Sequence, residues 1–146
     1  LVATWMIIVF KFSNEPADTS KNTSLNITKK IVSLFTNDRV SDEKKEQIID
    51  ELDPIVRKLA HFTLYAIGGF FVVGFANTYK IEDKKKLLYS ISMGAFYACT
   101  DEFHQLFDEG RSGQFIDVVI DSLGTSTGVC IFLYAIKLIK CSKAKI

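Results

Sequence analysis

Residues Phe96–Asp121 read FYACTDEFHQLFDEGRSGQFIDVVID, and the interpretation of the whole chain depends on this stretch. An apolar run leads into a group of acidic, basic and amide side chains, a short turn follows, and a second apolar run begins directly after it. Ionisable groups inside or at the end of a membrane-length segment are costly, so their default interpretation is a functional site. The stretch therefore predicts two membrane helices that meet at a polar hairpin tip.

Helical spacing aligns most of the polar residues that precede the turn. Asp101, His104 and Gln105 are three and four positions apart, which places them on one helix face. Glu102 lies about 100° round the helix from Asp101, because an α-helix has about 3.6 residues per turn. We therefore expect Glu102 to be a solvated or headgroup-level charge, away from the common face.

The second apolar run begins with an acidic pair. Asp117 and Asp121 are four positions apart and so share a helix face. Gly124, Thr125 and Gly128 continue this stripe with small side chains. Small residues let the backbones of two membrane helices approach closely. We expect a neighbouring helix to pack against this stripe, next to the two carboxylates.

These motifs resemble one known family. The string DEFHQLFDEGRSGQFIDVVIDSLGTSTG is similar to the signature of the VanZ-like membrane protein family, which is linked to teicoplanin resistance. The RKLAHF segment at 57–62 with Tyr65 after it, and the FSNEP segment at 12–16 with serines after it, resemble other parts of that family. The resemblance covers nearly the whole chain and implies a multi-pass protein of the bacterial plasma membrane. Glu15 departs from the pattern, in which a glutamine is expected.

The apolar runs predict an all-α fold, an integral membrane four-helix bundle that forms a single domain over residues 1–146. The first run is shorter than the about 20 residues that span a bilayer, so it is interpreted as a truncated span. Asp53–Pro54 is expected to begin the second span, with Asp as N-cap and Pro at the first helical position. The expected spans are 1–12, 55–76, 87–107 and 117–140.

A long polar segment, residues 13–53, connects the first and second spans. Ile27 and Ile31 begin an apolar pattern at helical spacing, which predicts a short amphipathic helix. Ser41 is a suitable N-cap for a second helix. The segment is too long for a simple connector. It is interpreted as a short external helical cap, which either packs on the membrane face of the bundle or forms a lid over a substrate groove.

Basic residues set the expected orientation. Lysines cluster between the second and third spans and in the C-terminal tail, and the positive-inside rule places both clusters in the cytoplasm. The start of the second span, the end of the third and the start of the fourth then lie at one depth near the outer leaflet. Three separate stretches thus bring polar side chains to one level. These side chains are Arg57, His61, Tyr65, Asp101, Glu102, His104, Gln105, Arg111, Asp117 and Asp121.

The residue types at this level favour acid–base chemistry on an anionic substrate. A carboxylate beside a histidine is the usual equipment for general acid–base catalysis. Guanidinium groups hold phosphate or carboxylate by paired hydrogen bonds. The expected substrate is an anionic lipid, such as a lipid-linked phosphate, or a cell-wall precursor. The catalytic candidates are Asp101, His104, His61 and Asp121, and the substrate-binding candidates are Arg57, Arg111, Gln105, Tyr65, Glu102 and Asp117.

Two alternatives stay open beside this hypothesis. The same carboxylates and histidines are acceptable ligands for a divalent ion, but the sequence has no tight metal-binding spacing, and neither a metal nor another cofactor is assigned. The charged groups would also serve as an interhelical clasp in a non-enzymatic membrane binding or organising protein. The net charge of +1 gives no argument for nucleic-acid binding. The residues leave open whether a substrate is turned over or only bound.

Overall fold

The computed structural model describes residues 1–15, 17–36, 40–107 and 113–143. All the regular structure in these residues is α-helical, so the all-α prediction is confirmed for the described part of the chain. The helices are α1 (Val2–Ser13), α2 (Ala17–Phe35), α3 (Asp42–Ala76), α4 (Asp83–Gln105) and α5 (Phe115–Lys143).

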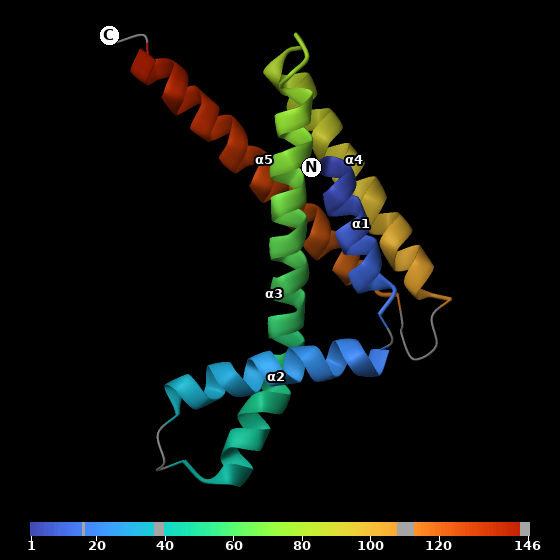
Figure 1. The fold of residues 1–146 in the computed structure, drawn as a ribbon, viewed down its shortest axis with the longest axis vertical. Coiled ribbons are helices and arrows are strands. Elements are labelled where there is room, and N and C mark those ends of the chain that lie inside the picture. The colour runs from blue at the N-terminus through green and yellow to red at the C-terminus, as the bar shows by residue number, and fades with distance from the viewer. Residues whose placement is uncertain (16, 37–39, 108–112, 144–146) are drawn as a thin grey trace.

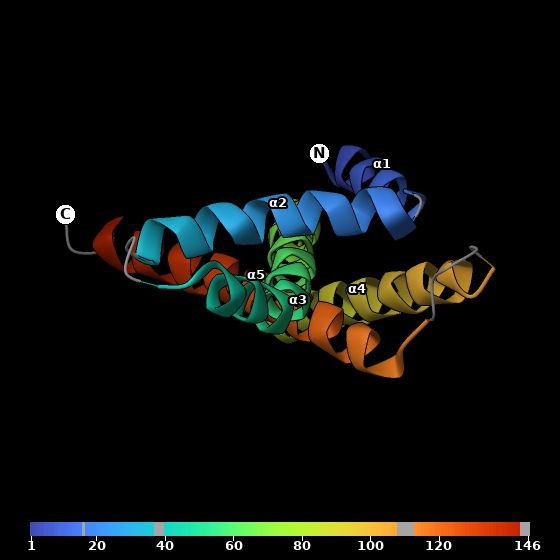
Figure 2. The same ribbon diagram turned by 90° about the horizontal axis from the view of Figure 1, so that it is seen from below.

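Helix α3 runs through the middle of the molecule, and the other helices are arranged around it (Figure 1). Helices α1 and α4 lie on one side of α3, and α5 crosses α3 before its C-terminal half diverges from the bundle. Helix α2 lies crosswise over the lower part of α3 (Figure 2). The end of α1, the end of α4 and the start of α5 all lie toward the α2 end of the bundle.

Two of the described helices, α3 and α5, are long and apolar enough to cross a membrane. They contain the predicted spans 55–76 and 117–140. Helix α1 is apolar but has 12 residues. Helix α4 has the sequence DKKK in its first turn and does not meet the same criterion of length and hydropathy. The four-span arrangement therefore stays a prediction.

Helix α3 begins much earlier than the sequence predicts. Pro54 lies inside this helix and not at its start, so residues 42–52 extend α3 and do not form a separate cap helix. Proline in a helix interior removes one backbone hydrogen bond and tends to bend the helix. Figure 1 shows α3 changing direction near the crossing with α2. At this crossing Thr28 of α2 donates a hydrogen bond of 3.2 Å to the carboxylate of Asp53, which ties the two helices together.

Helix α2 is the amphipathic helix that the sequence predicts between the first two apolar segments. Ser24, Thr28 and Val32 lie on one face and are buried. Ile27 and Leu34 lie beside this face and remain exposed. The cap is thus one crosswise helix with uncovered apolar side chains, and its placement at a membrane surface stays a prediction.

Glycines allow α5 to pass very close to α3. A methyl group at Gly124 would collide with the carbonyl oxygen of Phe62, and one at Gly128 would collide with the carbonyl oxygen of Ala66. Gly69 of α3 faces the backbone of α5 in the same way. The predicted small-residue stripe is therefore a helix contact, and its partner is α3.

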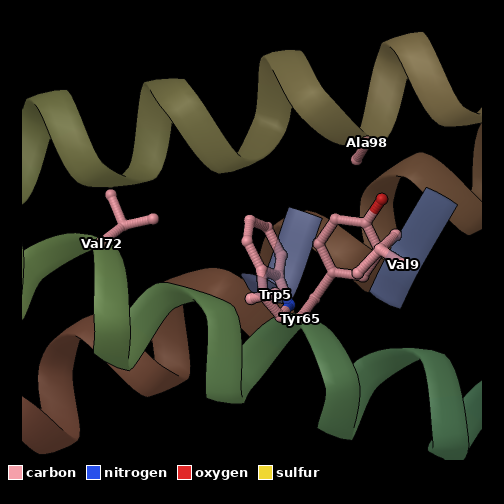
Figure 3. Packing of buried hydrophobic residues seen from close by; sticks show 5 residues of the cluster. All are labelled: Trp5, Val9, Tyr65, Val72 and Ala98. Carbon is pink, nitrogen blue, oxygen red and sulfur yellow. The ribbon is translucent and has the colours of Figure 1, made fainter. Parts of the chain in front are cut away.

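A buried apolar cluster fixes α1 against α3 and α4 (Figure 3). The indole Nε1 of Trp5 donates a hydrogen bond of 2.9 Å to the carbonyl oxygen of Leu64. The hydroxyl of Tyr97 donates a hydrogen bond of 2.7 Å to the carbonyl oxygen of Met6. The five residues drawn as sticks are Trp5, Val9, Tyr65, Val72 and Ala98.

The connection between α3 and α4 is held by a buried lysine. Lys86 is 7% exposed and donates hydrogen bonds to the side chains of Asn77 (2.9 Å) and Asp83 (3.0 Å). The bond from Lys86 lowers the pKa of the Asp83 carboxyl below its ordinary value. Lys86 therefore binds the end of α3 to the start of α4, whereas the sequence suggested only a topology signal in this lysine cluster.

Candidate functional site

Polar side chains from three helices meet at the end of the bundle where α4 ends and α5 begins. His61 comes from α3, Asp101 from the last turns of α4, and Asp121 from α5. One ring nitrogen of His61 and one carboxylate oxygen from each aspartate all lie within 4.8 Å of one another. The structure thus brings together three candidates that the sequence placed at one level. We call His61, Asp101 and Asp121 the triad.

Asp121 is the most deeply buried member of the triad. Its exposed fraction is 0%, and neither of its carboxylate oxygens has a hydrogen-bond partner among the residues that the structure describes. The Nδ1 atom of His61 lies 3.8 Å from Oδ2 of Asp121, which is longer than a hydrogen bond. The hydroxyl of Thr125 donates instead to the backbone oxygen of Asp121, at 3.1 Å.

Two further groups beside Asp121 are buried without hydrogen bonds. The Nδ1 atom of His61 and the hydroxyl of Tyr65 are both inaccessible and have no hydrogen-bond partner in the described part of the chain. Tyr65 lies one turn along α3 from His61 and is itself 0% exposed. An unsatisfied buried polar group costs about 1–3 kcal/mol, and most native structures contain few of them. A concentration of such groups at one place therefore requires an explanation.

The α4 side of the cluster is linked to α1. Asp101 and Gln105 are both buried. The amide of Gln105 donates long hydrogen bonds of 3.5 Å to Oδ2 of Asp101 and to the hydroxyl of Ser13. Ser13 is the last residue of α1 and was not among the sequence candidates. Its place in the FSNEP segment, which resembles part of the family pattern, was a signal for it.

His104 does not join the triad. Its ring packs edge-on against Phe10 of α1, with the two ring centroids 5.5 Å apart. The residue is half-buried between α4 and α1. Helical spacing places His104 one turn from Asp101 on α4. Its contact with Phe10 of α1 sets it apart from the triad.

The expectation that Glu102 is solvated was wrong. Glu102 is 6% exposed, and its carboxylate accepts a hydrogen bond of 2.9 Å from the backbone N–H of Gln114. The chain after the turn folds back over this face of α4. A Cβ atom at Gly113 would lie only 2.7 Å from the carbonyl oxygen of Glu102. The hydrogen bond between Gln114 and Glu102 thus holds the segment that leads into α5 against α4.

The basic candidates are arranged differently from the prediction. Arg57 is exposed and makes no ion pair among the described residues. Its neighbour Lys58, which the sequence analysis did not select, forms an ion pair with Asp117 across α3 and α5. The long lysine side chain reaches α5 although its backbone position lies off the predicted stripe. Arg111, the other basic candidate, lies outside the described residues.

Two cavities lie away from the triad. One of about 410 Å³ lies between the C-terminal parts of α3 and α5 and includes Asn77 and Lys137. The other has a volume of about 770 Å³ and is mostly apolar. It lies among α1, α3, α4 and α5, with Met6, Phe71 and Met93 among its lining residues.

Comparison with known proteins identifies the family of this chain. No curated protein and no solved structure matches it. The family model described as VanZ/LLP1 matches residues 1–139, which is almost the full length. The match includes the stretches that carry His61, Asp101 and Asp121. The chain belongs to the VanZ/LLP1 family.

Proposed function

We propose that this protein is a multi-pass protein of the bacterial plasma membrane that binds or modifies an anionic lipid or cell-envelope precursor at the triad. The apolar helices α3 and α5 support the membrane placement. The resemblance of the motifs to a family linked to teicoplanin resistance supports a substrate from the cell envelope. The triad supports the position of the headgroup, since it lies where α4 ends and α5 begins.

The observation that carries this proposal is the set of unsatisfied polar groups around Asp121. A structural clasp pairs its charges, because unpaired buried charges destabilise a membrane helix bundle. Lys58 and Asp117 form such a pair between α3 and α5. The side chain of Asp121 has no hydrogen-bond partner within residues 1–15, 17–36, 40–107 and 113–143, although it is fully buried. We therefore assign the clasp role to the Lys58–Asp117 pair and the ligand-binding role to the triad.

The apolar cavity supports a lipid as the ligand. Its lining residues on α3 lie between Phe70 and Phe75, beyond Tyr65 when the helix is followed from His61, and Val72 belongs to the Trp5 cluster as well. A ligand with its headgroup at the triad would extend its hydrocarbon chain along the bundle in this direction. Arg57 is exposed one turn before His61 on α3, so it offers a positive charge to an anionic headgroup at the triad.

Ligand binding can be tested on the protein in nanodiscs by native mass spectrometry with a polyprenyl phosphate and a polyprenyl pyrophosphate. We expect the wild type and Asp117→Asn to retain the lipid, because Asp117 belongs to the clasp. We expect Asp121→Asn to retain at least tenfold less. Equal retention by all three proteins, or none by the wild type, would rule out the triad as the headgroup site.

Thermal unfolding in detergent separates a ligand site from a clasp. In the presence of a chelator, Asp121→Asn should melt at or above the wild-type temperature, because the amide removes a buried, unpaired carboxylate. Asp117→Asn should lose about 1 kcal/mol of unfolding free energy, because it breaks a partly exposed ion pair. If Asp121→Asn melts well below Asp117→Asn, the triad holds the helices together and the ligand-site assignment is wrong.

The link to glycopeptides can be tested in cells. We expect expression in a teicoplanin-susceptible bacterium to raise the minimal inhibitory concentration several-fold. The variant Asp121→Asn should remove this gain, while Asp117→Asn, matched for membrane abundance by immunoblot, should keep most of it. An equal gain with Asp121→Asn would show that the phenotype does not depend on the triad.

A further inference from the structure

The triad places two buried carboxylates beside one imidazole. One carboxylate oxygen of Asp101 and one of Asp121 lie within 4.8 Å of each other, and both side chains are buried. Lys58, the nearest described lysine along α3, is already paired with Asp117. Burying charge without compensation is strongly unfavourable. A dipositive ion would offset the charge of Asp121, whose oxygens have no hydrogen-bond partner among the described residues, and the other two side chains lie close enough to help hold it.

The geometry also matches a metal site. In a tetrahedral site with metal–ligand bonds of about 2.1 Å, neighbouring ligand atoms are about 3.4 Å apart. Nδ1 of His61 and Oδ2 of Asp121 are 3.8 Å apart, and the third ligand atom lies within 4.8 Å of both. Small side-chain rotations would close this triangle around an ion.

The unpartnered carboxylate of Asp121 is an independent indication of a ligand. The side chain is fully buried, its two oxygens have no hydrogen-bond partner among the described residues, and one of them lies 3.8 Å from Nδ1 of His61. That nitrogen is also buried and without a partner. At 3.8 Å the imidazole nitrogen and the carboxylate oxygen are too far apart for a direct hydrogen bond, whereas a cation between them would satisfy both groups at once.

We propose that His61, Asp101 and Asp121 bind one divalent cation of the Mn²⁺ or Zn²⁺ class. Imidazole nitrogen favours first-row transition metals, and carboxylate oxygen favours harder ions, so a mixed set selects a metal that accepts both. Three protein ligands from three helices leave coordination positions open, as in metal sites that act on a substrate. The ion would join α3, α4 and α5 at one point.

A cation here would also explain how an acidic cluster receives an anionic headgroup. An open metal position binds a phosphate oxygen directly and offsets its charge. This bridging role rests on the proposed function, whereas metal binding by the triad does not. The two ideas therefore require separate measurements.

The first measurement is a titration of chelator-treated protein in detergent with MnCl₂, followed by electron paramagnetic resonance of the free ion. We expect one saturable Mn²⁺ site per chain in the wild type, with competition by Zn²⁺. Asp121→Asn and His61→Gln should bind at least tenfold more weakly. Asp117→Asn and Glu102→Gln are matched controls that remove neighbouring carboxylates outside the triad, and both should keep wild-type affinity.

Folding of each variant is checked by circular dichroism, so that a lost site is distinguished from an unfolded protein. Metal should also raise the melting temperature of the wild type and of Asp117→Asn but not that of Asp121→Asn, because a ligand of the native state stabilises it. Absence of saturable binding in the wild type, or equal affinity in folded Asp121→Asn, would overturn the metal site.

Lipid retention is then measured with and without the chelator. Loss of the polyprenyl pyrophosphate on chelation would support the bridging role. Retention of the lipid without metal would overturn the bridge and leave the proposed function standing. Metal binding without retention of any lipid would overturn the proposed function and leave the metal site standing.

Discussion

The substitution Gly128→Ala is expected to lower the free energy of unfolding by about 3 kcal/mol, the scale of an overpacked interface. The added methyl group would collide with the carbonyl oxygen of Ala66, and its next neighbours are the carbonyl carbon of Ala66, at 2.7 Å, and the backbone nitrogen of Phe70, at 2.9 Å. All three are backbone atoms, so no rotation of a side chain relieves the contact. Helices α3 and α5 would have to separate. Melting in detergent, followed by the fluorescence of the single tryptophan, measures the loss.

Gly74→Ala is the matched control for this prediction. At Gly74 the new methyl group would lie 3.3 Å from Cε2 of Phe132, the far end of a side chain that can move. Replacing glycine by alanine within a helix gains about 1 kcal/mol of helix propensity. We therefore expect Gly74→Ala to melt near or above the wild type. If Gly128→Ala melts together with it, the close approach of α3 and α5 is not the feature that holds the bundle.

Spacing along a helix predicted which residues share a face, but not what covers that face. The stripe Gly124, Thr125 and Gly128 was correctly predicted as a packing surface. The level shared by His61, Asp101 and Asp121 also followed from the order of apolar runs and the basic clusters. Contacts within one helix depend on local geometry, so the sequence carries them directly.

Tertiary contacts account for the errors. Asp53–Pro54 has the composition of a helix start, yet residues 42–52 continue the same helix, where Asp53 accepts a hydrogen bond from Thr28 of α2. Glu102 lies off the polar face of α4 but becomes buried when the chain returns over it toward α5. Neither contact can be read from one segment alone, because each depends on where a distant part of the chain packs.

Side-chain length explains why Lys58, and not the predicted Arg57, makes the contact with α5. The stripe rule compares Cα positions, and it selects Arg57 together with His61 and Tyr65. A lysine side chain extends far enough to leave its own face, so Lys58 reaches Asp117 on α5. Opposite charges at the starts of two apolar segments were the only available signal for this pair.

The substitution Trp5→Ala is expected to lower the free energy of unfolding by about 4 kcal/mol, as for other buried tryptophans. Trp5 is 3% exposed, lies against Gly68, and makes an edge contact with Tyr65 at a ring-centroid distance of 5.7 Å. Its removal leaves a cavity beside Tyr65. It also takes away the indole N–H that donates to the carbonyl oxygen of Leu64. Circular dichroism melting measures the loss, because this variant has no tryptophan fluorescence.

Two companion variants separate the causes. Ile7→Ala removes an exposed apolar side chain from the same helix and should change stability by less than about 0.5 kcal/mol. Trp5→Phe keeps an aromatic ring but loses the Nε1–H bond to Leu64, so it should fall between the other two. If Trp5→Ala melts with Ile7→Ala, α1 is not anchored through this side chain.

The substitution Trp5→Ala should affect the region of the triad as well as the melting temperature. Helix α1 reaches the cluster through Ser13, which receives a hydrogen bond from Gln105, the residue that also donates to Asp101. Without Trp5, α1 keeps the Tyr97–Met6 hydrogen bond, the ring contact between Phe10 and His104, the packing of Val9 and this long contact. We therefore expect Trp5→Ala to speed backbone hydrogen exchange in α1 and at the end of α4. Exchange at the Gly124–Gly128 crossing should stay slow, because α3 and α5 meet there without α1.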